Sequence, residues 1–146
     1  MSSNIDMVDL PILGTEEWCQ LNGLGIPWIK ARIDSGAKTS SIQAQNIKIF
    51  VKGGKEWASF EVFPIQENRS IKISCEAPLI DRRMVKSSSG ISEERFVVKT
   101  SLNMGEQEFD IELTLAAREN MEYRMLLGRE ALSGRFMVNP AKSFLY

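Results

Sequence analysis

The stretch that decides the fold is Ile29-Lys30-Ala31-Arg32-Ile33-Asp34-Ser35-Gly36-Ala37-Lys38-Thr39-Ser40. Up to Asp34 its apolar side chains alternate with polar ones, which is the period of a half-buried β-strand. Gly36 then permits a sharp turn and leaves room for another group to approach the backbone closely. The stretch therefore predicts a carboxylate, that of Asp34, presented at the end of a strand among small residues.

A plain structural interpretation of the same stretch is also open. An Asp at the end of a strand often accepts a hydrogen bond from a neighbouring backbone N–H and so stabilises a polar turn. Asp34-Ser35-Gly36-Ala37 alone does not separate a reactive carboxylate from a capping one. Evidence from the rest of the chain has to decide between them.

Length and charge place the chain among ordinary globular proteins. It has 146 residues and a formal net charge of -1, so we expect one domain, residues 1–146, without a bias toward nucleic acid or membranes. No apolar run reaches membrane-spanning length, and the first residues lack the basic-then-apolar order of a secretory signal. We therefore expect a cytoplasmic location.

The cysteine and histidine counts exclude several kinds of chemistry. Two cysteines, Cys19 and Cys75, are too few for a disulfide framework, so we expect two buried thiols. The chain has no histidine, which excludes Ser-His-Asp and Cys-His catalysis and the usual zinc-hydrolase sites. Gly53-Gly54-Lys55-Glu56 lacks the spacing of a phosphate-binding loop. We expect no metal and no cofactor.

Period-2 alternation dominates the chain and predicts an all-β fold with a closed or strongly curved sheet. Glycine-containing turns at Gly53-Gly54 and at 103–106 predict hairpins. Other expected features are strands at 42–51, 70–75 and 143–146, a helical turn at 116–121, and a short helix at 129–132. A serine-rich stretch at 86–90 is expected to form the tip of a long hairpin.

A second motif near the end of the chain, Leu126-Leu127-Gly128-Arg129-Glu130-Ala131-Leu132, makes the comparison with a known family specific. Together with Asp34-Ser35-Gly36-Ala37 it resembles the retropepsins. In that family an apolar-apolar-Gly-Arg step from strand to helix packs beneath the Asp-Thr/Ser-Gly loop. The resemblance implies a retropepsin-like closed barrel with one short C-terminal helix and a β-hairpin flap, for which residues 79–98 are the candidate.

Nearly the whole chain, from about Trp18 to Tyr146, is similar to a bacterial group of retropepsin-like proteins that often carries the label "ATP-dependent zinc protease". The group is also linked to the ATP-grasp ligase that adds glutamates to a ribosomal protein. The segments that carry this resemblance are Ile29 to Ser41, Cys75 to Arg83, Glu93 to Val98 and Tyr123 to Phe136. They supply neither a zinc site nor a nucleotide loop.

The resemblance implies an aspartic-type endopeptidase, in which two carboxylates face one water and hold one proton between them. This chain has one Asp-Ser-Gly motif and no second copy, so such an enzyme has to be a homodimer. The implied catalytic residues are Asp34, Ser35 and Gly36, with the Ser35 hydroxyl bonding across the two-fold axis. The implied substrate-binding residues are Ala37, Lys38, Arg82, Arg83 and Leu127. Gly128 and Arg129 are implied as structural support.

The sequence departs from retropepsins around this site. Lys38 stands where the family usually has an acid that pairs with the Arg of the terminal motif, so we expect Arg129 to pair with Glu130 or Asp81. A cleft containing Arg32, Lys38, Arg82 and Arg83 would be basic and would favour acidic or glutamate-modified peptides. The alternative is that these are ordinary solvated surface charges.

Two functions remain open from the sequence. One is a homodimeric aspartic endopeptidase whose partners are a second copy of the chain and a peptide or protein substrate. The other is a non-catalytic peptide-binding or regulatory module on the same fold, since likeness of fold does not establish activity.

Overall fold

The computed structural model describes residues 9–65, 70–86, 90–117 and 122–146, and strands dominate these ranges. The strands are β1 (Ile12–Leu13), β2 (Glu16–Leu21), β3 (Ile26–Ile33), β4 (Ser40–Gln43), β5 (Gln45–Lys52), β6 (Lys55–Val62), β7 (Ile73–Lys86), β8 (Ser92–Met104), β9 (Gln107–Ala116), β10 (Met125–Leu127) and β11 (Met137–Val138). A 3-10 turn covers Asn22–Leu24, and the helix α1 covers Arg129–Leu132. The predicted mostly β chain with a short C-terminal helix is confirmed.

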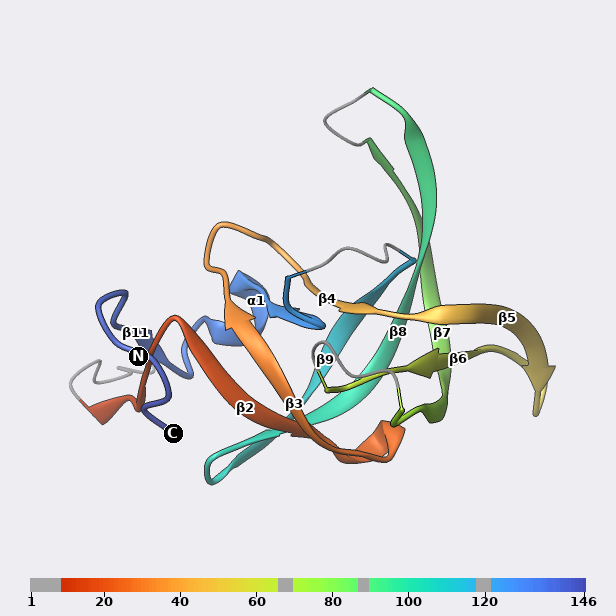
Figure 1. Ribbon diagram of the computed structural model, residues 1–146. Coiled ribbons are helices and arrows are strands. Elements are labelled where there is room, and N and C mark those ends of the chain that lie inside the picture. Colours follow the sequence, from red (N-terminus) through yellow and green to blue (C-terminus); the bar gives the residue numbers. More distant parts are fainter. Residues whose placement is uncertain (1–8, 66–69, 87–89, 118–121) are drawn as a thin grey trace, which may run out of the picture.

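One mixed sheet of nine strands makes up most of the fold, in the order β2-β3-β10-β4-β9-β8-β7-β6-β5 (Figure 1). The pairs β3–β10 and β4–β9 are parallel, and the other neighbours are antiparallel. A further pairing of Gln20 with Asn103 joins β2 to β8, so the sheet is partly closed into a ring. Strands β1 and β11 form a separate parallel pair.

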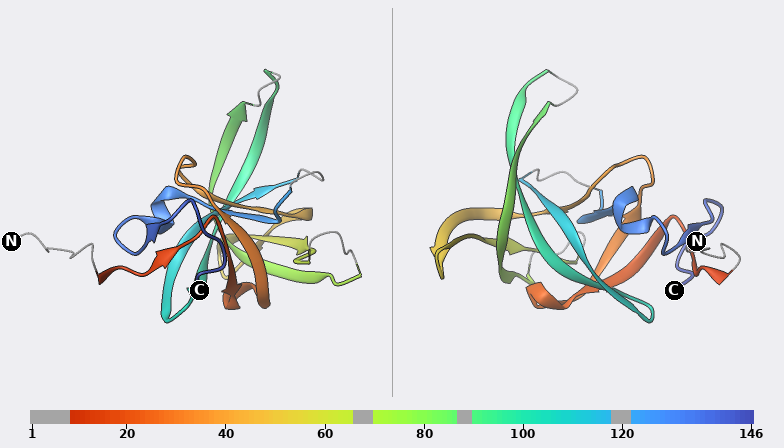
Figure 2. Two further views of the ribbon diagram at one scale, coloured as in Figure 1. Left: turned by 60° about the vertical axis from the view of Figure 1, so that its left-hand side comes forward. Right: turned by 180° about the vertical axis from the view of Figure 1, so that it is seen from behind.

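The long hairpin of β7 and β8 extends well beyond the body of the sheet (Figure 2). Its strands have 14 and 13 residues, and they remain paired from Leu79 opposite Val98 out to Lys86 opposite Ser92. A register shift between Leu79 and Asp81 marks a bulge, which bends a strand and increases its twist. The serine-rich tip expected from the sequence includes residues 87–89, which lie outside the described residues.

The core is filled by the alternating apolar side chains that the sequence pattern indicated. Ile29, Ala31 and Ile33 of β3 are all buried, as are Ala58, Phe60 and Val62 of β6. Both predicted hairpins form: the Gly53 and Gly54 residues have positive φ between β5 and β6, and Gly105 has positive φ between β8 and β9. Alternation was therefore a reliable guide wherever a strand lies with one face on the core.

Four local predictions were wrong or fall outside the described residues. The expected single strand at 42–51 is interrupted at Ala44, which is fully buried and donates its N–H to the Ala116 carbonyl. The strand expected at 70–75 begins only at Ile73, as the start of β7, and Ile71 before it is 47% exposed. No strand forms at 143–146. Ala116 ends β9 rather than starting a helical turn, and residues 118–121 are not described.

Both cysteines are free and buried, as predicted. Burial raises the pKa of each thiol to about 12, so neither sulfur is a ready nucleophile near neutral pH. Among the described residues, no helix is long and apolar enough to cross a membrane.

A buried carboxylate, that of Glu17, fastens the end of the chain to the turn before β2. Glu17 is fully buried. One carboxylate oxygen accepts from the Gly14 and Leu145 N–H groups, each at 2.8 Å, and the other accepts from the Tyr146 N–H at 2.9 Å. Three backbone donors thus compensate a charge that would otherwise be costly to bury.

We expect Glu17→Gln to lower the free energy of unfolding by about 2–3 kcal/mol, because the amide nitrogen cannot accept and at least one buried donor loses its partner. Urea denaturation measures this change. Glu106→Gln is the matched control, because Glu106 is an exposed turn residue. A Glu17→Gln protein as stable as the Glu106→Gln protein would show that the three hydrogen bonds do not fix the tail.

Candidate active site

Asp34 lies immediately after β3, and its loop is ordered by its own hydrogen bonds. The Asp34 N–H donates to the Leu127 carbonyl at 2.9 Å, which continues the parallel pairing of β3 with β10. Within the loop, the Gly36 N–H donates to the Asp34 carboxylate at 3.0 Å and the Ala37 N–H donates to the Asp34 carbonyl at 3.2 Å. The carboxylate is half-buried, and Ser35 and Gly36 are exposed. The loop therefore presents an acid at the surface on a fixed backbone.

The second motif lies directly against this loop. The Arg129 N–H donates to the Ala37 carbonyl at 2.7 Å, and the Glu130 N–H donates to the Lys38 carbonyl at 3.1 Å. The Gly128 N–H donates to the Ser40 hydroxyl at 3.0 Å. The structure thus brings together two stretches that are about ninety residues apart in the sequence.

Gly128 is where the two backbones cross most closely. A Cβ placed on it would lie 2.6 Å from the carbonyl carbon and oxygen of Thr39 and 2.9 Å from the Ala37 carbonyl oxygen. All three atoms belong to backbone, which cannot rotate away as a side chain can. Only glycine fits at this crossing.

The Arg129 side chain does not make the ion pair expected for it. Its guanidinium donates to the Ser35 carbonyl at 3.2 Å. Asp81, one of the two expected partners, is bound by Arg83 instead. In the part of the chain that the structure describes, no ion pair joins Arg129 to Glu130, the other expected partner. The expectation from the sequence was wrong because it required another acidic side chain as the partner of Arg129. Here a backbone carbonyl of the Asp34 loop binds the guanidinium instead.

Arg82 and Arg83 are on β7, and their charges are compensated locally. Arg82 pairs with Glu56 at 2.6 Å, and Arg83 pairs with Asp81 at 2.8 Å and with Glu112 at 3.0 Å. The Arg83 guanidinium, and then the Arg82 N–H, lower the pKa of the Asp81 carboxyl. These groups are largely exposed to solvent, so each pair contributes little to stability. Among the described residues, no hydrogen bond or ion pair joins either arginine to the Asp34 loop.

The remaining predicted substrate-binding residues lie in different environments. Ala37 is partly exposed and Lys38 is exposed, both on the loop itself. Leu127 is fully buried and contributes its carbonyl to Asp34, so its side chain is not available to a substrate. Leu127 therefore lies beneath the loop and supports it, rather than contacting a substrate as expected.

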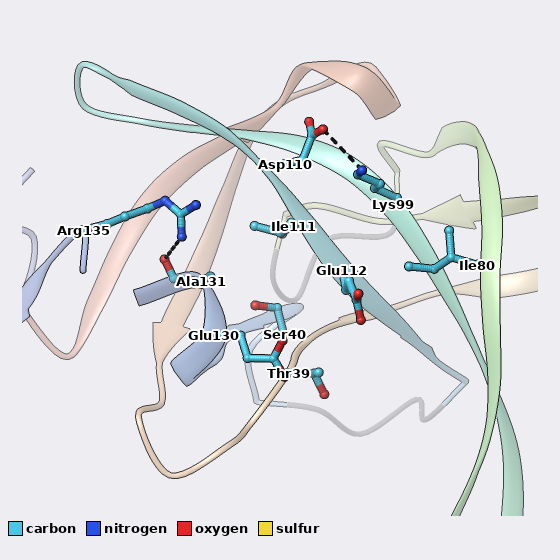
Figure 3. Close-up of a pocket in the computed structure, with 10 residues that line it drawn as sticks. All are labelled: Thr39, Ser40, Ile80, Lys99, Asp110, Ile111, Glu112, Glu130, Ala131 and Arg135. Carbon is cyan, nitrogen blue, oxygen red and sulfur yellow. Dashed lines mark hydrogen bonds and ion pairs between the residues drawn. The ribbon is translucent and has the colours of Figure 1, made fainter. Parts of the chain in front are cut away.

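A pocket of about 470 Å³ lies beside the loop, between α1 and the strands of the long hairpin and β9 (Figure 3). It is lined by Thr39, Ser40, Ile80, Lys99, Asp110, Ile111, Glu112, Glu130, Ala131 and Arg135. Lys99 of β8 and Asp110 of the neighbouring β9 form a loose ion pair at 3.8 Å along one wall of the pocket. This pocket was not predicted from the sequence, although a signal was available: Lys99, Asp110 and Glu112 occupy polar positions of alternating strands.

These features define a class: mostly β proteins in which an Asp-Ser-Gly-Ala loop rests on a Gly-Arg step from strand to helix. Residues 12–146 match the family described as RimB-like, retropepsin-like aspartic endopeptidase RimB, and the chain belongs to this family. The resemblance found in the sequence is confirmed. Among the described residues, no group of three or more Cys, Asp or Glu side chains is arranged to hold a metal ion.

Curated relatives are longer proteins. A protein of Desulfotalea psychrophila described as a probable alpha-L-glutamate ligase is 55% identical over 130 residues, which are 89% of this chain and 28% of that protein. One of Shewanella pealeana with the same description is 52% identical over 133 residues, 91% of this chain and 29% of that protein. The chain thus spans less than a third of the length of these relatives.

A solved structure supports the fold. The crystal structure of Lpg0085, a protein of unknown function from Legionella pneumophila, superposes with a TM-score of 0.77 at 27% sequence identity. The superposition covers 92% of this chain and 97% of that chain. The mostly β architecture described above is therefore shared over almost the whole length.

Proposed function

We propose that this chain is an aspartic-type endopeptidase that acts as a homodimer, with Asp34 from each copy at the two-fold axis. The observation that carries the proposal is the clamped loop: three hydrogen bonds tie residues 37–40 to Gly128, Arg129 and Glu130 beneath them. A rigid, half-buried carboxylate is what two copies need in order to hold one water in a fixed position.

In this mechanism the two Asp34 carboxyl groups share one proton. The ionised one removes a proton from water as it attacks the peptide carbonyl, and the protonated one donates to the carbonyl oxygen. The tetrahedral intermediate then collapses and the C–N bond breaks. The carboxyl group that took the proton from water gives it to the leaving nitrogen, and the other carboxylate takes back the hydroxyl proton as the carbonyl re-forms. The partly closed sheet corresponds to the retropepsin barrel in this proposal, and the β7–β8 hairpin is the flap that covers the bound peptide.

For the substrate we propose acidic or glutamate-modified peptides. Support comes from the exposed Lys38, four positions after Asp34, and from the relatives described as probable alpha-L-glutamate ligases. We further propose that the chain works together with a glutamate ligase. Because Arg82 and Arg83 already have acidic partners, they are expected to contribute less than Lys38 to the selection of an acidic peptide.

One observation favours a second candidate, a peptide-binding module without catalysis. The Asp34 carboxylate already accepts the Gly36 N–H at 3.0 Å, which is the contact of an Asp that stabilises a turn. A protein that binds glutamate-rich peptides but cleaves none would belong to this second class.

Dilution of the enzyme tests the proposed dimer. With a glutamate-rich peptide as substrate, cleavage per chain should fall by about tenfold or more as the protein is diluted below its dimer dissociation constant, because each chain holds half of the site. A peptide of the same length with glutamine in place of glutamate is the control for charge and should be cleaved more slowly. Cleavage per chain that stays constant on dilution of a strictly monomeric protein would contradict the proposal.

A further inference from the structure

Aromatic side chains gather on the outer surface of β2 and β3, away from the Asp34 loop. Trp18, Trp28, Ile65 and Tyr146, here called the aromatic patch, line an open hollow of about 510 Å³. Trp18 is 40% exposed, Trp28 53% and Tyr146 45%. Contiguous apolar surface of this kind marks docking sites, and tryptophan and tyrosine dominate the energetics of interfaces.

Two rings of the patch, those of Trp18 and Tyr146, are held in place by contacts within the chain. The Lys30 ammonium lies 5.9 Å from the centroid of the Trp18 ring and 5.9 Å from that of Phe144, and these two rings stack at 6.5 Å. The Tyr146 N–H is bound by the buried Glu17. The Tyr146 ring packs so closely on Gly105 that a Cβ added there would overlap the ring. A partner would therefore meet a preformed surface and pay little to order it.

The patch is remote from the contact that the proposed dimer needs. Trp28 is an exposed residue near the start of β3, whereas Asp34 follows the end of that strand, six positions further on, which is roughly 20 Å along an extended chain. A two-fold axis that brings Asp34 against its symmetry mate lies at the other end of β3. The aromatic patch is thus free for a different partner.

We propose that the aromatic patch docks a glutamate-ligase domain, whether in the same polypeptide or in a separate one. This rests on the part of the proposed function that pairs the chain with a ligase. Four relatives are each described as a probable alpha-L-glutamate ligase, and the region matching this chain makes up only 28–29% of their length. In such proteins the remaining polypeptide is permanently next to this domain, and apolar side chains from it would fill the hollow.

The test measures binding of the full chain to the ligase part of the Desulfotalea psychrophila relative, which is the polypeptide outside the matched region. Ligation of glutamate by this part first shows that it is folded. Calorimetry should detect binding, and Trp28→Ser should weaken it by about tenfold or more. Val51→Ser is the matched control, because Val51 is 71% exposed on β5, and it should bind like the unmodified chain.

Three outcomes would overturn the proposal: no binding by the unmodified chain, unchanged binding after Trp28→Ser, or a shift of Trp28→Ser from dimer to monomer in sedimentation, which would make a second copy the occupant. Trp28 is half-exposed, so the variant should keep the unfolding midpoint of the parent. The assay measures binding alone, so a failed peptidase proposal and a failed docking proposal remain distinguishable.

Discussion

Replacing Asp34 with Asn should lower kcat/KM for peptide cleavage by about 10³-fold or more. The expected loss is large because one substitution removes both carboxylates of a homodimer, and an amide can neither take a proton from water nor share one with its twin. Asn has nearly the shape of Asp, and its side-chain oxygen can still accept the Gly36 N–H. The loop should therefore survive while the chemistry is lost.

Asp9→Asn provides the control, since it makes the same chemical change at an exposed position before β1. Both variants should keep the unfolding midpoint of the parent, and only the Asp34 variant should lose cleavage. A tenfold excess of Asp34→Asn chain mixed with active chain should also suppress the activity, because most active chains would then sit in mixed dimers. Full activity of Asp34→Asn, or no suppression in the mixture, would contradict the proposed mechanism.

The strands could be predicted from the sequence because half-burial leaves a direct trace in residue order. Ile29, Ala31 and Ile33 alternate with polar neighbours, and all three are buried. The alternation fails where the environment changes along one segment. At Ala44 the chain passes from β4 to β5, and with that step from pairing with β9 and β10 to pairing with β6. Sequence alternation does not report which strand is the neighbour.

The motif that presents Asp34 could also be predicted, because the Asp34-Ser35-Gly36-Ala37 and Gly128-Arg129 sequences are local and specific. The partners of the charged groups could not be predicted. Arg129 donates to a backbone carbonyl, and Arg83 takes the Asp81 that was expected for Arg129. Side-chain pairing depends on distances across strands that are far apart in the sequence, and several weak exposed pairs of similar energy compete for each charge.

Glu17 illustrates a residue whose importance sequence patterning hides. In the order Glu16-Glu17-Trp18-Cys19 it is one of two adjacent acids, and nothing in the pattern singles it out. The structure buries Glu17 and leaves Trp18 on the surface, where it forms part of the aromatic patch. The inner face of β2 thus holds residues 145–146 through Glu17, and its outer face contributes Trp18 to the proposed docking surface.

Gly128→Ala should be the most destabilising of the substitutions considered for the loop, with a loss of about 2–4 kcal/mol in the free energy of unfolding. The Gly128 backbone has φ -92° and ψ 176°, which any residue can adopt, so the cost is purely steric. The added methyl group would overlap the backbone of Thr39 and Ala37, and the loop that carries Asp34 would have to move. Thermal unfolding should show a midpoint about 5–15 °C lower.

Gly36→Ala is the matched control on the same loop. There the added Cβ would meet only a carboxylate oxygen of Asp34, at 3.3 Å, and a side-chain oxygen can shift by rotation. We therefore expect Gly36→Ala to lower the midpoint by much less than Gly128→Ala, while cleavage falls in both because both disturb Asp34. Equal midpoints for the two variants would show that the crossing at Gly128 can relax, and the clamp beneath Asp34 would then not be the rigid support on which the proposed mechanism depends.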